Sequence, residues 1–162
     1  MRKYTYIIIG LVVVVIFLYS VKRYEVFYID ADTNKLVPKK VIVINPFFRK
    51  DVYAFLLLNK LKVDIGNNIS AVGNYVDFED VKIKGNYCVV NLKVKKGFIN
   101  SSNSEYMLLK SIMKTLKSFD NNIKLFKINV QNSETDLQMD YNCAMTLEDN
   151  EIKIVEGSCN EK

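Results

Sequence analysis

Histidine and tryptophan are absent from this sequence of 162 residues, and proline occurs only twice. Without histidine, the chain lacks the side chain that proteins use most often as a general base and as a metal ligand. The P-loop, GxGxxG, GxSxG and HExxH patterns are missing as well. These absences predict a chain without a cofactor, a bound metal or an enzymatic activity.

One cysteine and two pairs of adjacent carboxylates remain as candidates for chemistry. A cysteine nucleophile needs a partner base, whereas Cys88 lies in an apolar alternation that is typical of a small core residue. Paired carboxylates could cleave a glycosidic bond. Glu79-Asp80 and Glu148-Asp149 are adjacent in a strand or a turn, however, so their side chains point apart or into solvent. We therefore expect no catalytic residue.

The three cysteines fit neither a disulfide framework nor a paired CxxC metal site. Cys143 and Cys159 both lie in the C-terminal tail, where they could pair. The sequence alone does not decide whether they do.

Long hydrophobic runs are also scarce, with one exception at the N-terminus. Residues 4–20 carry no charge and are flanked by Arg2-Lys3 and Lys22-Arg23. Extended to residue 21, the run makes a helix of about 27 Å, close to the lower limit for crossing a bilayer. The alternative is a cleaved signal peptide, but small residues are lacking where signal peptidase would cut. Residues 1–23 are therefore expected to form a transmembrane anchor.

The orientation of this expected anchor follows from its flanking charges, which are nearly balanced. A very short N-terminal tail ahead of one span usually stays inside the cell. The rest of the chain is then expected on the outer side of the membrane, in a Gram-positive-type envelope or in the intermembrane space of a sporulating cell.

Without the four flanking basic residues, residues 24–162 carry 19 basic and 18 acidic side chains, a net charge of +1. These residues are nearly neutral overall, so they lack the excess of basic side chains that is typical of nucleic-acid binding. The charge is uneven, because residues 131–162 carry −6 and residues 24–130 carry +7. The acidic tail could lie across the basic body, the body could face an anionic surface, or the lysines could simply be solvated.

The first half of residues 24–130 predicts two strands and a helix. Residues 24–29 and 36–44 are rich in aromatic and β-branched side chains, and the unbroken apolar run at 41–44 suggests a strand covered on both faces. Residues 49–63 then show helical spacing. The expected core stripe is Ala54, Leu57, Leu58, Leu61 and Ile65. Three further apolar residues widen this face, either inside the domain or as a candidate partner interface: Val52, Phe55 and Leu56.

A β-hairpin is predicted around the two-residue turn Gly85-Asn86. Val81, Ile83, Val90, Leu92 and Val94 share one face. Before residue 79, the apolar side chains alternate in the opposite phase to those after it, which predicts a bulge near Glu79-Asp80. The other face holds a row of lysines that could bind an anionic polymer: Lys82, Lys84, Lys93 and Lys95.

The second half predicts a helix followed by a strand at 123–130. Ser102 and Glu105 match a capping box that would begin the helix, and Asp120 follows its end. In residues 131–162, two strand-like segments at 137–141 and 151–155 favour an extra hairpin with its turn at 148–150, and acidic disorder is the alternative.

The expected fold class is α+β, with one mixed sheet and two helices packed on one face in the order β-β-α-β-β-α-β. A transmembrane helix precedes this domain, and a possible extra β-hairpin follows it. Five stretches fill this order: Val26-Phe27-Tyr28, Leu36-Val37-Pro38, the helix around Ala54 to Leu61, the hairpin from Val81 to Val94, and Glu105 to Leu116 with the strand through Val130. In this order and sequence detail the chain resembles the GerMN-type domain of sporulation and spore-germination proteins, here in a single copy on a membrane anchor.

The resemblance implies an envelope-anchored protein, because family members are often lipoproteins and some act in the assembly between mother cell and forespore. We therefore expect a non-enzymatic envelope component that binds itself or related domains. The alternative is a binding module for anionic cell-wall polymers or lipid head groups that uses the four lysines of the hairpin.

Overall fold

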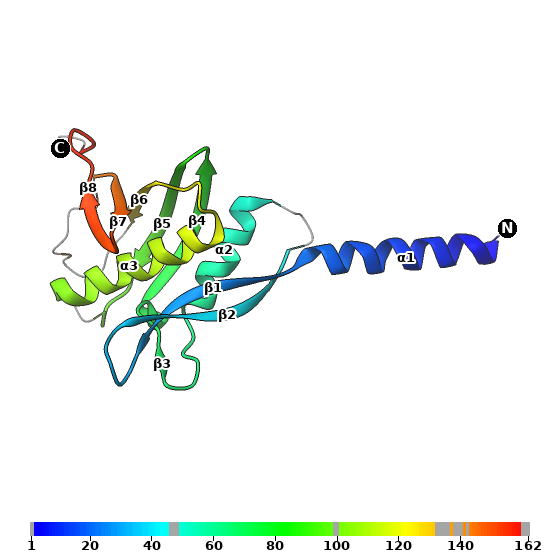
Figure 1. Ribbon diagram of the computed structural model, residues 1–162, viewed down its shortest axis with the longest axis horizontal. Helices are drawn as coiled ribbons and strands as arrows, with labels where there is room; N and C mark the ends of the chain where they lie inside the picture. The colour runs from blue at the N-terminus through cyan, green and yellow to red at the C-terminus, as the bar shows by residue number, and fades with distance from the viewer. Residues whose placement is uncertain are drawn as a thin grey trace.

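The computed structural model describes residues 2–45, 49–98, 101–131, 137, 141 and 143–159. Helix α1 (Arg2–Ser20) extends from one end of a domain built of two β-sheets and two helices (Figure 1). The apolar side chains from Tyr6 to Ile16 are exposed along α1. The buried apolar core is drawn instead from residues 26–147.

The transmembrane anchor expected at residues 1–23 is wrong. Among the described residues, no helix is both long enough and apolar enough to cross a membrane. Strand β1 (Val21–Asp30) begins directly after α1, because Val21 pairs with Ile44 of β2. The uncharged part of the helix therefore stops at Ser20.

Strands β1 and β2 (Leu36–Ile44) form a long antiparallel hairpin, and the two-residue strand β3 (Asn68–Ile69) pairs with the end of β1. The order in this sheet is β2-β1-β3, so β2 is an edge strand. Pro38 lies in this edge strand, where a missing N–H interrupts no ladder. The expectation that residues 41–44 are covered on both faces is wrong, since Ile42 and Ile44 are exposed while Val41 and Val43 are buried.

Beyond its short pairing with β3, the edge of β1 opposite β2 is bonded to helix α3 (Ser102–Phe119) at Phe27. The backbone N–H of Phe27 donates to Thr115 Oγ1 at 3.1 Å, and Ser111 Oγ donates to the Phe27 carbonyl at 2.6 Å. Both hydroxyl side chains are fully buried. Two polar residues of α3 thus provide the hydrogen bonds that a neighbouring strand would otherwise supply to Phe27.

The second sheet has the order β4-β5-β6-β7-β8. Strands β4 (Val76–Lys84) and β5 (Tyr87–Val94) form the predicted hairpin, and the register shifts between Phe78 and Asp80 as the expected bulge requires. Strand β6 (Leu125–Val130) is parallel to β5, and α3 forms the crossover between them. The buried face carries Val81, Val90, Leu92 and Val94, as predicted.

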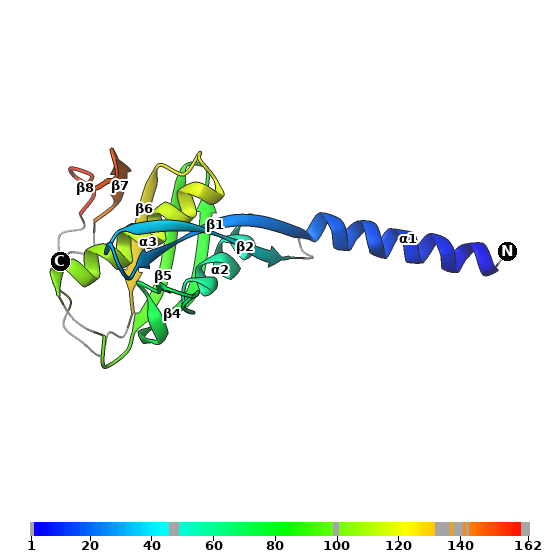
Figure 2. The same ribbon diagram turned by 60° about the horizontal axis from the view of Figure 1, so that its bottom comes forward.

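The expectation of one mixed sheet with both helices on one face is also wrong, although the α+β class is correct. The strands form two separate sheets, and each helix contacts both of them. Helix α2 (Lys50–Lys60) contacts β1, β2 and β4, whereas α3 contacts β1 and β7. Figure 2 shows the β1–β2 hairpin crossing the helices on the side away from the second sheet. This layering explains why the apolar arc of α2 is so wide.

Most of the stripe predicted for α2 is correct, because Ala54, Leu57, Leu58 and Leu61 are fully buried. Ile65 does not belong to it. The helix ends at Lys60, and Ile65 lies in the following loop with 41% of its surface exposed.

The capping box predicted at Ser102 and Glu105 is wrong, because the helix is capped one residue earlier. Ser101 is the N-cap, and its hydroxyl accepts from the Ser104 backbone N–H at 3.1 Å. Glu105 is fully buried, and Tyr141 donates a hydrogen bond to its carboxylate at 3.3 Å. Burial, followed by the negative charge of Glu105, raises the pKa of Tyr141.

The tail contains an extra hairpin around the expected turn, formed by β7 (Met145–Glu148) and β8 (Glu151–Ile154). Its first strand is not the segment expected at 137–141, most of which lies outside the described residues. Cys143 and Cys159 form a disulfide that joins the two ends of the hairpin. Ser158 adds a hydrogen bond from the Ala144 N–H to its own hydroxyl at 3.0 Å.

Candidate functional site

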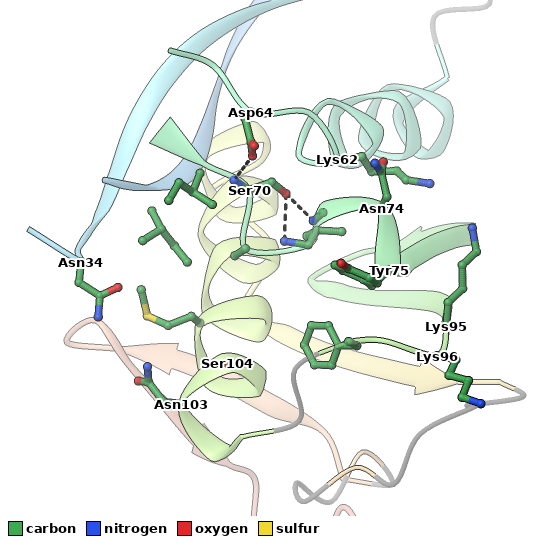
Figure 3. Close-up of a pocket in the computed structure, with 17 residues that line it drawn as sticks. Asn34, Lys62, Asp64, Ser70, Asn74, Tyr75, Lys95, Lys96, Asn103 and Ser104 are labelled. Atoms are coloured by element: carbon green, nitrogen blue, oxygen red, sulfur yellow. Dashed lines mark hydrogen bonds between the residues drawn. The ribbon is translucent and has the colours of Figure 1, made fainter. Parts of the chain in front are cut away.

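A cavity of about 750 Å³ opens between the α2–β4 connection, the end of β5 and the first turn of α3 (Figure 3). Its volume falls in the range of roughly 300–1,000 Å³ that small-molecule sites occupy. The lining is partly apolar, with Ile69, Phe98 and Met107, and partly polar, with Asn34 and Asn103. We call this cavity the Tyr75 pocket, after the aromatic ring at its centre.

A loop stabilised by the hydrogen bonds of Ser70 lines one side of the Tyr75 pocket. The Ser70 hydroxyl accepts from the backbone N–H groups of Val72 at 3.0 Å and Gly73 at 2.6 Å. The same hydroxyl donates to the Leu61 carbonyl, and the Ser70 N–H donates to Asp64 Oδ1 at 2.7 Å. These bonds hold residues 70–73 in one conformation relative to the end of α2 (Figure 3).

Two glycines lie near the two edges of the Tyr75 ring, where a side chain on either would approach it closely. A Cβ built on Gly73 would lie 3.5 Å from Cδ2 of the ring, and one on Gly97 would lie 3.2 Å from Cε1. Both glycines have positive φ, at +56° and +96°. The Tyr75 carbonyl also accepts from the Lys95 N–H at 2.7 Å. The backbone of Tyr75 is thus bonded to the end of β5, and 46% of the residue is exposed.

Asp77 forms ion pairs with two lysines that line the Tyr75 pocket. Its two carboxylate oxygens pair with Lys62 Nζ at 2.5 Å and with Lys95 Nζ at 2.6 Å. The hydrogen bond from Lys62, followed by that from Lys95, holds the pKa of Asp77 below its ordinary value. Lys96 and Asp64 also line the cavity. Lys62 and Lys95 are therefore both paired with Asp77 at the edge of the pocket.

The chemistry of the described residues is limited. They contain no group of three or more His, Cys, Asp or Glu side chains placed to hold a metal ion. Asp64 is the carboxylate among the residues that line the Tyr75 pocket. Cys88 is fully buried in β5, and burial raises the pKa of its thiol to about 12.

We expect Cys88 to resist alkylation by iodoacetamide at pH 8 in the folded protein, because its thiol is both buried and almost entirely protonated. Mass spectrometry of the unfolded chain should find one added label without reductant and three after reduction, since the other two cysteines are bonded. Rapid labelling of the folded protein at Cys88 would contradict this assignment.

The three residues proposed as a partner interface lie on α2, where they are half-buried. Val52 and Phe55 line a depression of about 230 Å³ together with Val81 of β4. Phe55 and Leu56 pack partly against the core. The structure therefore brings Val52 and Phe55 together, whereas Leu56 does not line this depression.

Three of the four lysines proposed to bind anionic polymers lie on the outward face of the β4–β5 hairpin, whereas Lys95 follows the end of β5 and lines the Tyr75 pocket. Lys82 and Lys84 alternate with inward side chains on β4, and Lys93 does so on β5. Carboxylates lie between them, since Lys82 pairs with Asp80 at 3.0 Å and Lys95 pairs with Asp77. The face is consequently of mixed charge rather than a continuous row of cations.

The patterns in the sequence do not predict the Tyr75 pocket. The pocket draws on β3, the connection to β4, the end of β5 and α3, which lie far apart in the sequence. A weak local signal was present in Gly73-Asn74-Tyr75, where an aromatic residue follows a glycine in a polar loop. Nothing in the sequence places Gly97 against the same ring.

No family model matches this sequence, and no curated protein matches it either. Solved structures do show the fold. The first GerMN domain of the sporulation protein GerM from Bacillus subtilis matches with a TM-score of 0.54 and 14% identity, covering 74% of this chain and 95% of that domain. The tandem GerMN domains of the same protein match with a TM-score of 0.53 and 18% identity, covering 72% of this chain and 41% of that one.

A Clostridium perfringens protein described as a candidate lipoprotein matches with a TM-score of 0.49 and 17% identity, covering 80% of this chain and 90% of that one. This score is too low to support an argument. The two GerM structures are sufficient for the fold, and this chain has a GerMN-type fold, as its sequence resemblance implied.

Proposed function

We propose that this protein is a non-enzymatic component of the bacterial cell envelope that acts in sporulation by binding other protein domains, among them domains of its own fold. The fold it shares with the GerMN domains of a Bacillus subtilis sporulation protein supports the cellular context. The proposed contact surface is the depression between α2 and β4.

The disulfide supports a location outside the cytoplasm. Cytosolic proteins are normally kept reduced, whereas exported proteins form and retain disulfides. Cys143 and Cys159 are bonded to each other across the β7–β8 hairpin, and Cys88 is buried away from them. An exported domain is therefore the better fit to this pattern of cysteines.

The observation that carries the binding function is the depression between α2 and β4. Three apolar residues line it, Val52, Phe55 and Val81, together with four charged residues: Arg49, Asp51, Glu79 and Asp80. Protein–protein contacts usually combine apolar residues with polar residues at the rim. A volume of about 230 Å³ accommodates one large apolar side chain of a partner.

We expect the protein to self-associate in a concentration-dependent way and Val52→Glu to weaken this association at least about tenfold, because a charge would then be buried in the contact. Sedimentation velocity of residues 19–162 measures this, since that segment keeps the whole buried core and the Ser20 carbonyl that Tyr53 binds.

The matched control is Ile154→Glu, which places the same charge on an exposed apolar residue of β8. It should leave the association unchanged. A monomer at high concentration that also fails to bind purified GerMN domains would overturn the proposed function.

The lysine face of the hairpin remains the alternative, as a site for anionic cell-wall polymers or lipid head groups. The ion pairs of Lys82 and Lys95 with Asp80 and Asp77 weaken it, because part of the positive charge is already neutralised. Salt-sensitive retention on purified cell wall, lost when all four lysines are replaced by Gln, is the outcome that would favour it.

A further inference from the structure

The open edge of strand β2 is a second contact surface: we propose that it binds an extended segment of a partner protein along residues 40–44. The segment carries two β-branched apolar residues and then an acidic residue, at alternate positions. Addition of a strand to a sheet edge is a recurring mode of peptide recognition. This surface is separate from the depression on α2, which no residue of β2 lines, so the inference does not depend on the proposed function.

Alternate residues of β2 direct their backbone N–H and C=O groups away from β1. In an antiparallel pair, directly opposite residues alternate between bonded and non-bonded pairs. The Asn45 N–H donates to the Ser20 carbonyl at 3.0 Å. At the other end of the hairpin, the Asp30 N–H donates to the Lys35 carbonyl at 2.9 Å. With the continuous register between these ends, the odd-numbered residues of β2 bond to β1. The residues with outward backbone groups are therefore Lys40, Ile42 and Ile44.

These outward groups are left open, unlike the corresponding groups of β1. Within the ranges that the structure describes, the backbone hydrogen bonds outside the helices and ladders include none from residues 36–44. On β1, the N–H and C=O of Phe27 point away from β2 in the same way, and both are bonded to α3. The hairpin is thus covered at one edge and open at the other.

The other edge strands carry features that discourage strand addition, namely short length, charge or a bulge. Strand β3 has two residues, and β8 has four, of which two are charged. The register of β4 shifts between Phe78 and Asp80. Strand β2 has nine residues, and Pro38 and two lysines are confined to its first five. Residues 41–44 are all β-branched and uncharged, so this part of the edge is suited to pairing.

Two exposed isoleucines define the apolar part of the partner. Ile42 and Ile44 are 50% and 49% exposed, and they share one face of β2. The residues directly opposite them in an added strand lie on that same face, where β-branched side chains pack well against isoleucine. A segment with β-branched residues at these two positions therefore removes apolar surface from water.

Lys40 defines the charged position of the partner. It lies on the same face as Ile42 and is opposite Glu25 of β1. Among the ion pairs of the described residues, none includes Lys40 or Glu25. A partner carboxylate opposite Lys40 thus meets an ammonium group that is not already paired. Opposite charges at directly opposite positions stabilise a pair of strands.

NMR spectroscopy of the full chain in a mild detergent tests the surface with the peptide Thr-Val-Thr-Val-Thr-Glu-Thr. Bound antiparallel to β2, its valines lie opposite Ile44 and Ile42, and its glutamate lies opposite Lys40. The amide signals of these three residues should shift. With excess peptide their hydrogen exchange should slow at least about tenfold, because each N–H gains an acceptor. Absence of these shifts at millimolar peptide overturns the proposal. Shifts that follow protein concentration without peptide would assign the edge to a second copy instead.

Two N-methylated peptides separate backbone pairing from side-chain contact. Methylation of the valine opposite Ile42 removes a donor that faces β2, so it should weaken binding at least about tenfold. Methylation of the threonine that follows this valine changes an N–H that points away from β2, so it should change binding less than about threefold. Equal binding of the two methylated peptides would show that no strand is added.

A charge reversal tests the position of the peptide. Lys40→Glu should weaken binding by about threefold or more, and a peptide with lysine in place of glutamate should restore it. The control Lys84→Glu makes the same change on an exposed lysine of β4 and should leave binding unchanged. A loss that the altered peptide does not restore would overturn the assigned position. Self-association of the same samples should not change with Lys40→Glu, so failure here is distinguishable from failure of the proposed function.

Discussion

The double substitution Ser111→Ala and Thr115→Val should lower the free energy of unfolding by about 3 kcal/mol, because each lost hydrogen bond leaves one buried backbone group of Phe27 unpaired at about 1–3 kcal/mol. Thr115 Oγ1 accepts from the Phe27 N–H, and Ser111 Oγ donates to the Phe27 carbonyl. Val has nearly the shape of Thr, so the loss reports mainly on hydrogen bonding. The two single effects should not add, since both bonds hold the same residue of β1.

Urea unfolding followed by circular dichroism measures this loss, and hydrogen exchange of the Phe27 amide identifies its origin. Ser118→Ala is the matched control, because Ser118 is exposed on the same helix. It should change stability by less than about 0.5 kcal/mol. A double variant that loses no more than this control would show that α3 does not hold the edge of β1.

Reduction of the Cys143–Cys159 disulfide should lower stability by about 3 kcal/mol, the chain-entropy value for a cross-link that spans this separation of 16 residues. The effect should be concentrated in the β7–β8 hairpin. Its ends are otherwise joined by few bonds, such as that from the Val155 N–H to the Ala144 carbonyl at 2.9 Å. Part of the loss is therefore local opening of the hairpin.

Urea unfolding with and without reductant, together with hydrogen exchange in β7 and β8, provides the measurement. The control is the double variant Cys143→Ala and Cys159→Ala, whose stability should already be low and should not respond to reductant. If reductant leaves the wild-type protein unchanged, the disulfide does not contribute to the stability of this fold.

Several elements could be predicted because their signals are local. The strand at residues 36–44 matches β2 residue for residue, and the hairpin around Gly85-Asn86 carries its bulge where the phase of the apolar residues changes. Turn chemistry and side-chain periodicity act over a few residues, so they can be recognised without any tertiary contact. The buried stripe of α2 was predictable for the same reason up to Leu61.

The incorrect expectations have two different causes. The helix expected at the N-terminus includes Val21, but pairing with the distant Ile44 draws that residue into β1. The capping box expected at Ser102 and Glu105 fails locally, because the neighbouring Ser101 accepts from the Ser104 N–H and is the cap. The first error depends on a partner that the local sequence does not contain, and the second on a choice between adjacent serines.

By itself, the sequence determined the α+β class, the identity of most strands and helices, the bulged hairpin and the shortage of catalytic side chains. Only the tertiary structure decided that the strands divide into two sheets, because that division depends on Phe27 meeting Thr115, 88 positions away. The same holds for the Tyr75 pocket, where Gly73 and Gly97 reach one ring from different strand ends. Periodicity and turn preferences act between near neighbours, whereas the edge of a sheet and the walls of a cavity are set by segments that meet only after the chain has folded.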